Sequence, residues 1–131
     1  TFIGGSNVDE SEGIAVEANG NVLVTGRTLS RDFPVTSTAL RQTHGGNEFD
    51  GLVVRLSSDL KTLHYATLIG GASYDFVRSC CIDQEGNLYI AGGCNGDGWP
   101  LRKALQPEFR GTDDGRWGNG DAIIAKLRPT R

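Results

Sequence analysis

One stretch occurs twice in the sequence, and this repeat limits the possible folds more than any other feature. Residues 13–26 read GIAVEANGNVLVTG and residues 79–92 read SCCIDQEGNLYIAG, with the Gly-Asn pair of the second copy 66 positions after that of the first. Each copy contains two short runs of β-prone residues joined by a glycine-containing turn, which is typical of a β-hairpin.

Further matches keep the same spacing. They pair residues 1–5 (TFIGG) with residues 67–71 (TLIGG), Asp9 with Asp75, and Phe33-Pro34 with Trp99-Pro100. Beyond these matches an insertion lengthens the spacing to 71, so that residues 50–56 (DGLVVRL) match residues 121–127 (DAIIAKL). A spacing that holds over so many positions indicates that the chain is built from two copies of one structural unit.

The composition narrows the class of protein. Glycine accounts for 19 of 131 residues, about twice the usual share, and glycines spread among short apolar runs predict many tight turns in an all-β protein. The net charge of −3 predicts no general affinity for nucleic acid, and no apolar run reaches the roughly 20 residues that span a bilayer. The three cysteines lack a CxxC spacing, so we expect free thiols.

Each unit contains candidates for short strands. The predicted strands cover residues 12–17, 21–25, 51–56 and 63–69 in the first unit, and residues 78–83, 87–91 and 122–127 in the second. The second unit has no counterpart of the fourth strand, and the only other trace of that strand is at residues 1–3. The connection between the second and third strands of the first unit is long, and we interpret it as an ordered loop with a helical turn at residues 38–42.

Two of the predicted strands are apolar on both faces. Leu52-Val53-Val54 and Ile123-Ile124-Ala125 do not alternate with polar residues, which is typical of a sheet that is covered on both sides. Four-stranded sheets stacked around an axis have this property. An open sandwich also buries its strands, but it does not predict a 66-residue repeat.

We therefore predict an all-β fold, a β-propeller of four-stranded blades with two blades in this chain. Residues 1–5 are expected to be an outer-strand segment that completes another blade. Residues 6–71 are expected to form blade one. Residues 72–131 are expected to form an incomplete blade two that lacks its outer strand.

The residues of these strands resemble a known family. Residues 65–71 (YATLIGG), the hairpin at 13–26, Asp32-Phe33-Pro34 and residues 121–127 are similar to the bacterial β-propeller repeat called SBBP. The resemblance implies a ring of roughly six or seven blades in a secreted or cell-surface bacterial protein that acts as a scaffold or binding module, without shared catalytic residues. Two blades do not close such a ring. The expected partners are further blades, from the same parent chain or from other copies in a homo-oligomer, for example three copies forming six blades.

Residues that recur in both units are interpreted as structural, because a structural group is needed in every blade. The pairs Asp9/Asp75 and Asp50/Asp121 recur, and we expect these carboxylates to accept backbone N–H bonds in loops. The two histidines have no partners at a spacing that indicates a metal site or a catalytic triad. His64 is expected on a strand surface, and His44 is a candidate for exposure in a loop.

Two loops differ between the copies and gather oxygen-bearing side chains among glycines. Such loops suit Ca²⁺, which prefers oxygen ligands on flexible backbone. The spacing does not match an EF-hand, so local Asx turns are the alternative interpretation. The candidate calcium ligands are Asp97, Asp113, Asp114 and Asn119.

A tryptophan in the insertion at residues 106–120 is the main candidate for recognising a protein or glycan partner. Trp117 has no counterpart in the first unit, and an indole ring can stack on a sugar or a peptide. Arg110 and Arg116 flank it and can hold an anion or contact its ring. Trp99 is a weaker candidate because it matches Phe33, which favours a packing role.

We expect a non-catalytic propeller module that serves as an extracellular scaffold or partner-binding surface. One alternative is a propeller enzyme of the lyase or glycosidase type, which would use paired carboxylates; Asp97, Asp113 and Asp114 are its only support. Another alternative is an accessory subunit that docks on a larger complex through residues 106–120.

Overall fold

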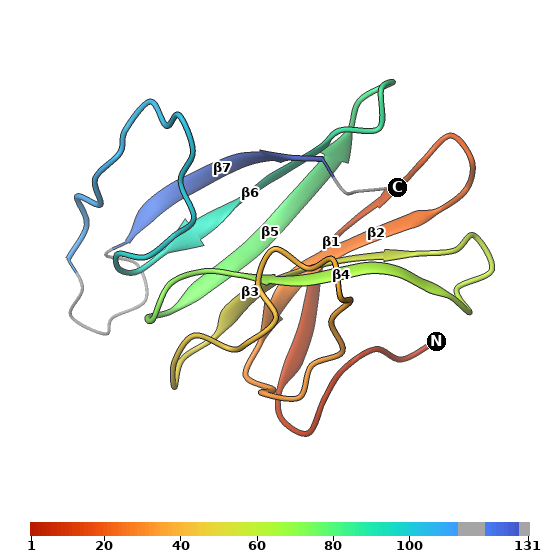
Figure 1. Ribbon diagram of the computed structural model, residues 1–131, viewed down its shortest axis with the longest axis horizontal. Helices are drawn as coiled ribbons and strands as arrows, with labels where there is room; N and C mark the ends of the chain where they lie inside the picture. Colours follow the sequence, from red (N-terminus) through yellow and green to blue (C-terminus); the bar gives the residue numbers. More distant parts are fainter. Residues whose placement is uncertain (113–119, 129–131) are drawn as a thin grey trace.

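The computed structural model contains two antiparallel β-sheets that pack against each other (Figure 1). The structure describes residues 1–112 and 120–128. The first sheet has the spatial order β1 (Asp9–Val16), β2 (Val22–Thr28), β3 (Asp50–Leu56), β4 (Leu63–Ile69). The second sheet has the order β5 (Asp75–Ile82), β6 (Leu88–Cys94), β7 (Asp121–Leu127). No helix occurs in these described ranges, so the all-β prediction is confirmed for them.

All seven strands predicted outside residues 1–3 are present in the expected order. The two hairpin strands of each unit extend three residues further than predicted at the end away from the turn, because pairing continues past a β-bulge. The bulges lie between Ser11 and Gly13 in β1 and between Val77 and Ser79 in β5. The sequence did not reveal these extensions, because a bulge breaks the alternation by which a strand is recognised.

Both hairpin turns have the geometry that their glycines predict. Gly20 has φ of 86° and Gly86 has φ of 80°, a region that favours glycine. The Gly20 amide donates to the Glu17 carbonyl at 2.8 Å, and the Gly86 amide donates to the Asp83 carbonyl at 3.1 Å. Turn chemistry therefore sets the hairpins independently of the rest of the fold.

The segment from residue 29 to residue 49 is an ordered loop, but the helical turn predicted at residues 38–42 is wrong. The Ala39 amide donates to the Thr36 carbonyl and closes a single turn. The backbone of Arg41 then bonds to β4, with its carbonyl accepting from the Leu68 amide at 3.2 Å and its amide donating to the Thr67 hydroxyl at 3.0 Å. Because β4 takes these backbone groups, the helical bonds do not form.

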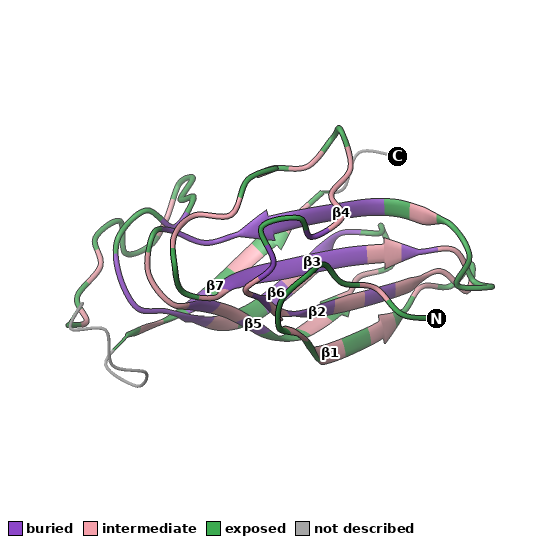
Figure 2. Ribbon diagram, turned by 90° about the horizontal axis from the view of Figure 1, so that it is seen from below, coloured by how far each residue is buried: buried purple, intermediate pink, exposed green. Residues whose placement is uncertain are grey.

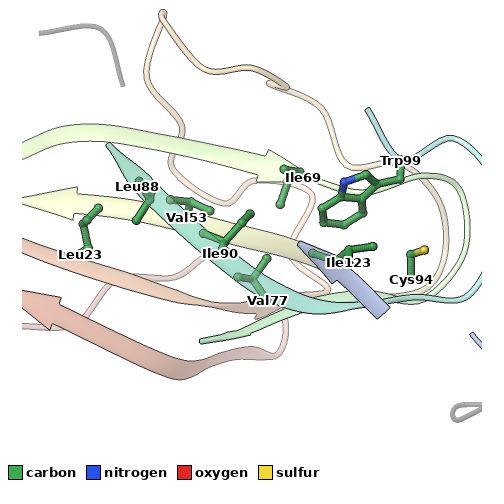
Figure 3. Close-up of a cluster of buried hydrophobic side chains, with 9 residues drawn as sticks. All are labelled: Leu23, Val53, Ile69, Val77, Leu88, Ile90, Cys94, Trp99 and Ile123. Carbon is green, nitrogen blue, oxygen red and sulfur yellow. The ribbon is translucent and has the colours of Figure 1, made fainter. Parts of the chain in front are cut away.

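Two apolar clusters cover the two faces of the first sheet. One lies between the sheets and includes Leu23, Val53 and Ile90 (Figure 3). The other lies on the opposite face, where Phe33 packs on β3 and β4. The central strand β3 is therefore buried almost along its whole length, as Figure 2 shows.

Within the described part of the chain, β7 is covered on one face only, and coverage of its other face stays a prediction. Ile123 is 7% exposed and faces the first sheet, whereas its neighbour Ile124 is 83% exposed. No described segment packs on the outer face of the second sheet as the first sheet packs on its inner face. The apolar pattern of β7 therefore leaves one face without a partner.

Residues 1–5 form no strand in the structure. Ile3 packs against the cluster around Phe33, whereas Phe2 is fully exposed. The pairing of this segment with another blade stays a prediction, as do the number of blades and the closure of a ring. Among the described residues, no helix has the length and apolar character needed to cross a membrane.

Candidate functional site

The four recurring aspartates have the role that their recurrence predicts. Each carboxylate accepts a hydrogen bond from a backbone amide in a neighbouring loop, which ties the loop to a strand end. The donors are Gly5 for Asp9 at 2.8 Å, Gly45 for Asp50 at 2.7 Å, Gly71 for Asp75 at 2.8 Å and Arg110 for Asp121 at 2.8 Å. These aspartates are structural in both units.

The surroundings of two matching aspartates differ between the units. Asp9 also accepts from the Thr28 hydroxyl at 2.5 Å and from the Ser30 hydroxyl at 3.0 Å. The positions of these hydroxyls hold Cys94 and Gly96 in the second unit. The strand end of the second unit has therefore lost two hydroxyl donors, and a different loop follows it.

Asp50 is the most unusual carboxylate of the first unit. The residue is fully buried, and its Oδ1 has no hydrogen-bond partner within the described part of the chain. Burial raises the pKa of Asp50 above its ordinary value, while the Gly45 amide and the nearby His44 act in the opposite direction. The His44 Nδ1 lies 4.0 Å from Asp50 Oδ2.

The two histidines lie in different environments. His44 has a side chain that is only 2% exposed, and its ring bridges the carbonyls of Thr28 at 3.0 Å and Gly46 at 3.1 Å. The expectation of an exposed His44 is therefore wrong, because the loop folds back onto the end of β2. His64 is exposed on β4, as predicted.

The predicted recognition and calcium residues fall into two groups. Trp99 is 8% exposed and packs in the cluster between the sheets, so it contributes to the core (Figure 3). Arg110 and Asp97 are exposed. The remaining predicted residues, Asp113, Asp114, Arg116, Trp117 and Asn119, lie outside the described residues.

The described residues do not form a metal centre by themselves. Within residues 1–112 and 120–128, no three His, Cys, Asp or Glu side chains lie close enough together to hold a metal ion. Of the predicted calcium ligands only Asp97 is described. The calcium hypothesis therefore depends on residues 113–119 and stays a prediction.

The loop after β6 forms a cavity that the sequence did not predict. Its volume is about 420 Å³, and its lining includes Asp97, Trp99, Phe109 and Asp121. The same loop carries two leucines that point their apolar surface to solvent, Leu101 at 52% and Leu105 at 104% exposure. Exposed apolar groups beside a cavity are typical of a binding surface.

The sheets also meet through charged and aromatic side chains that the sequence analysis missed. The Arg78 Nε lies 3.0 Å from Glu12 Oε2 and links β5 to β1. The Tyr74 hydroxyl oxygen accepts a hydrogen bond from the Arg27 guanidinium, and its ring packs edge-on against Phe49, with ring centroids 5.4 Å apart. The only signal in the sequence was that Glu12 and Arg78 stand 66 positions apart, at the same place in each unit.

The three cysteines are free thiols, as predicted. Cys81 is exposed, Cys80 is half-buried and Cys94 is buried. Burial raises the pKa values of the Cys80 and Cys94 thiols. These two thiols are therefore poor nucleophiles at neutral pH.

Comparison with known families supports the repeat that the sequence and the fold indicate. The family model described as the SBBP beta-propeller repeat matches residues 1–34 and 64–98. These two segments contain β1, β2, β5 and β6, and the sheets of four and three strands are consistent with partial propeller blades. Among curated proteins, none matches the chain. The family model matches both copies of the repeat, and the two matched segments together cover more than half of the chain. The chain therefore belongs to the SBBP beta-propeller repeat family.

Proposed function

We propose that this chain is a non-catalytic β-propeller repeat module that acts as an extracellular scaffold or partner-binding surface. The observation that carries the proposal is the packing of two repeats face to face around one buried cluster, with an apolar face left open beyond them. The family resemblance suggests a secreted or cell-surface bacterial protein as its setting.

Further blades are the first partners of such a module. Among the described strands, β7 pairs only with β6, whereas its counterpart β3 pairs with both β2 and β4. Residues 1–3 are the sequence counterpart of residues 67–69 in β4. In the register of β3 and β4, Leu52 pairs with Leu68, so a segment equivalent to residues 1–3 places Phe2 opposite Ile123. This pairing would bury the exposed Phe2 and complete a blade.

The loop after β6 supplies the surface for a protein or glycan partner. It departs from the repeat, it encloses the cavity of about 420 Å³, and it exposes Leu101 and Leu105. Asp121 holds the end of the loop through the Arg110 amide, so the loop sequence can vary without loss of the blade. A rigid scaffold with one variable loop is a common arrangement for recognition.

A loop exchange tests this function. Residues 106–120 are replaced by residues 41–49, which precede the matching aspartate in the first unit. We expect the exchanged chain to keep its far-ultraviolet circular dichroism and its melting temperature, and to lose binding on arrays of bacterial surface proteins and glycans.

A matched control replaces the turn at residues 57–62 by glycine and serine, which should leave binding unchanged. Binding that survives the exchange would exclude residues 106–120 as the part of the loop that binds the partner. Cleavage of any arrayed polysaccharide by the purified chain would contradict the non-catalytic assignment.

A further inference from the structure

The two sheets contact each other through different faces, which we call the back face and the front face of a sheet. The back face of the first sheet presents Ala15, Leu23 and Val53 toward the second sheet. The front face of the second sheet presents Ile82 and Leu88, among others, toward the first. Figure 3 shows side chains of both faces meeting in one cluster.

Each sheet also has the other kind of face. The back face of the second sheet is open, and the front face of the first sheet is open over β1, whereas Phe33 covers it over β3 and β4. The back face of the second sheet, at the counterparts of Ala15 and Val53, carries Cys81 and Ile124. Ile124 is 83% exposed. The front face of the first sheet, at the counterparts of Cys80 and Ile82, carries Ile14 and Val16, which are 70% and 65% exposed. The two open faces are thus the same pair that already packs inside the chain.

A cavity marks the place where an incoming chain would enter. Inside the chain, Tyr74 leads into β5 and packs on Arg27 and Phe49. The counterparts of Arg27 and Phe49 in the second unit are Gly93 and Gly120, and they line a cavity of about 180 Å³ on the back face of the second sheet. The counterpart of Tyr74 is Val8, which is 44% exposed.

A buried amide in the same cavity lacks a partner. Asn95 lines the cavity and is 3% exposed, and neither its Oδ1 nor its Nδ2 has a hydrogen-bond partner among the described residues. A buried carboxamide without a partner is unfavourable. An extended segment entering at this point brings backbone N–H and C=O groups that can satisfy it.

The charges determine which open faces can meet. Arg78 and Glu12 form an ion pair across the sheets and occupy the same repeat position. Two front faces that met would place Glu12 beside Glu12, and two back faces would place Arg78 beside Arg78. A back face that meets a front face places Arg78 beside Glu12 of the next chain, so complementary charge selects this arrangement.

We propose that a second copy of this chain docks head to tail, with the front face of its first sheet on the back face of the second sheet. This proposal rests on the proposed role as a propeller module and adds its partner. In the stack of sheets that results, Glu12 on each β1 strand and Arg78 on each β5 strand follow one another in alternation from sheet to sheet.

Cross-linking between variants that each carry one introduced cysteine tests the docking. In the chain, the Cys80 side chain lies against Thr25, and their counterparts across the new interface are Ile14 and Ala91. The variants Ile14→Cys and Ala91→Cys are made in a Cys81→Ser background, mixed and oxidised. We expect the mixture to give a disulfide-linked dimer in several-fold higher yield than either variant alone.

The Cys81→Ser chain without further substitution is the control for cross-linking through Cys80 and Cys94. An Ile14→Cys sample that cross-links with itself as well as the mixture does would indicate a front-to-front dimer and overturn the proposal. A mixture that yields no more dimer than the control would also overturn it.

Charge reversal tests the selection by Glu12 and Arg78. Both cysteine variants are prepared with Glu12→Arg, with Arg78→Glu, and with both reversals. Each single reversal should lower the yield of linked dimer several-fold, and the double reversal should restore it, because opposite charges meet again. Circular dichroism melting of each variant shows whether it is folded.

Folded single reversals that cross-link as well as the parent would overturn the charge argument. The outcome is separate from that of the loop exchange, because residues 106–120 lie outside the substituted positions. Partner binding that persists while the mixture fails to cross-link would leave the proposed function standing and remove only the second copy as the partner.

Discussion

Two adjacent isoleucines of β7 allow the packing of the sheets to be measured with the same substitution at each. Ile123 lies in the cluster between the sheets and is 7% exposed, whereas Ile124 is 83% exposed. Replacing either by alanine removes three carbon atoms and the same β-branched shape. The difference between the two free energies of unfolding therefore isolates the contribution of burial.

The magnitude follows from the carbon atoms removed from the core. Three buried methylene equivalents contribute about 2.4 kcal/mol at roughly 0.8 kcal/mol each, and an incompletely closed cavity adds to this within the usual range of about 2–5 kcal/mol for such truncations. The loss of strand propensity, at most about 1 kcal/mol, is common to both variants. We expect Ile123→Ala to be about 2–3 kcal/mol less stable than Ile124→Ala.

Urea unfolding at low protein concentration, followed by circular dichroism, measures this difference. With a slope of about 1–3 kcal/mol per molar urea, the midpoint of Ile123→Ala should lie about 1 M below that of Ile124→Ala. Equal midpoints would show that the two sheets do not share a core at this position. A reversed order would indicate a one-residue shift of β7, because such a shift exchanges the faces of every side chain.

The remaining predictions concern pH, glycine geometry and thiol reactivity. Because burial raises the folded-state pKa of Asp50 above its ordinary value of 3.8, the charged form is disfavoured in the folded chain. The parent chain should therefore lose stability relative to Asp50→Asn as the pH rises from 3 to 7, and urea midpoints with no such trend would contradict this. A methyl group at Gly26 would overlap a carbonyl oxygen of the adjacent strand. A methyl group at Gly86 would lie in open space, so that only the positive φ of this residue disfavours it. Gly26→Ala should lower the free energy of unfolding by about 3 kcal/mol and Gly86→Ala by about 1 kcal/mol, and similar urea midpoints for the two would refute the close approach of β1 and β2. Cys81 should react with Ellman's reagent within seconds to minutes and Cys94 only on unfolding, since the first is exposed and the second is 6% exposed; rapid reaction of Cys94 in the folded chain would contradict its burial.

The sequence predicted the strands well because their signals are local. Each hairpin consists of a glycine turn between two β-prone runs, and the repeat showed the same pattern twice. The carboxylate caps were also predictable, since an aspartate that recurs beside a loop has a structural role in each unit. The β-bulges were not predictable, because Asp9–Ser11 and Asp75–Val77 do not show the alternation of a regular strand.

The candidate site was predicted only in part. Trp99 was correctly matched with Phe33, and each packs in the apolar cluster on the corresponding face of its sheet. The cavity beside Trp99 and the exposed Leu101 and Leu105 were missed, because the path of an irregular loop depends on contacts that residue spacing does not encode.

The sequence by itself determined the repeat, the hairpins and the family, because turn geometry and strand propensity act between neighbouring residues. Only the tertiary structure decided which face of each strand is buried. Leu52, Val54 and Ile124 are similarly apolar, yet the first two are buried while Ile124 is open to solvent. The tertiary structure also decided that Glu12 meets Arg78, since an ion pair between residues of two sheets depends on how those sheets are placed in space.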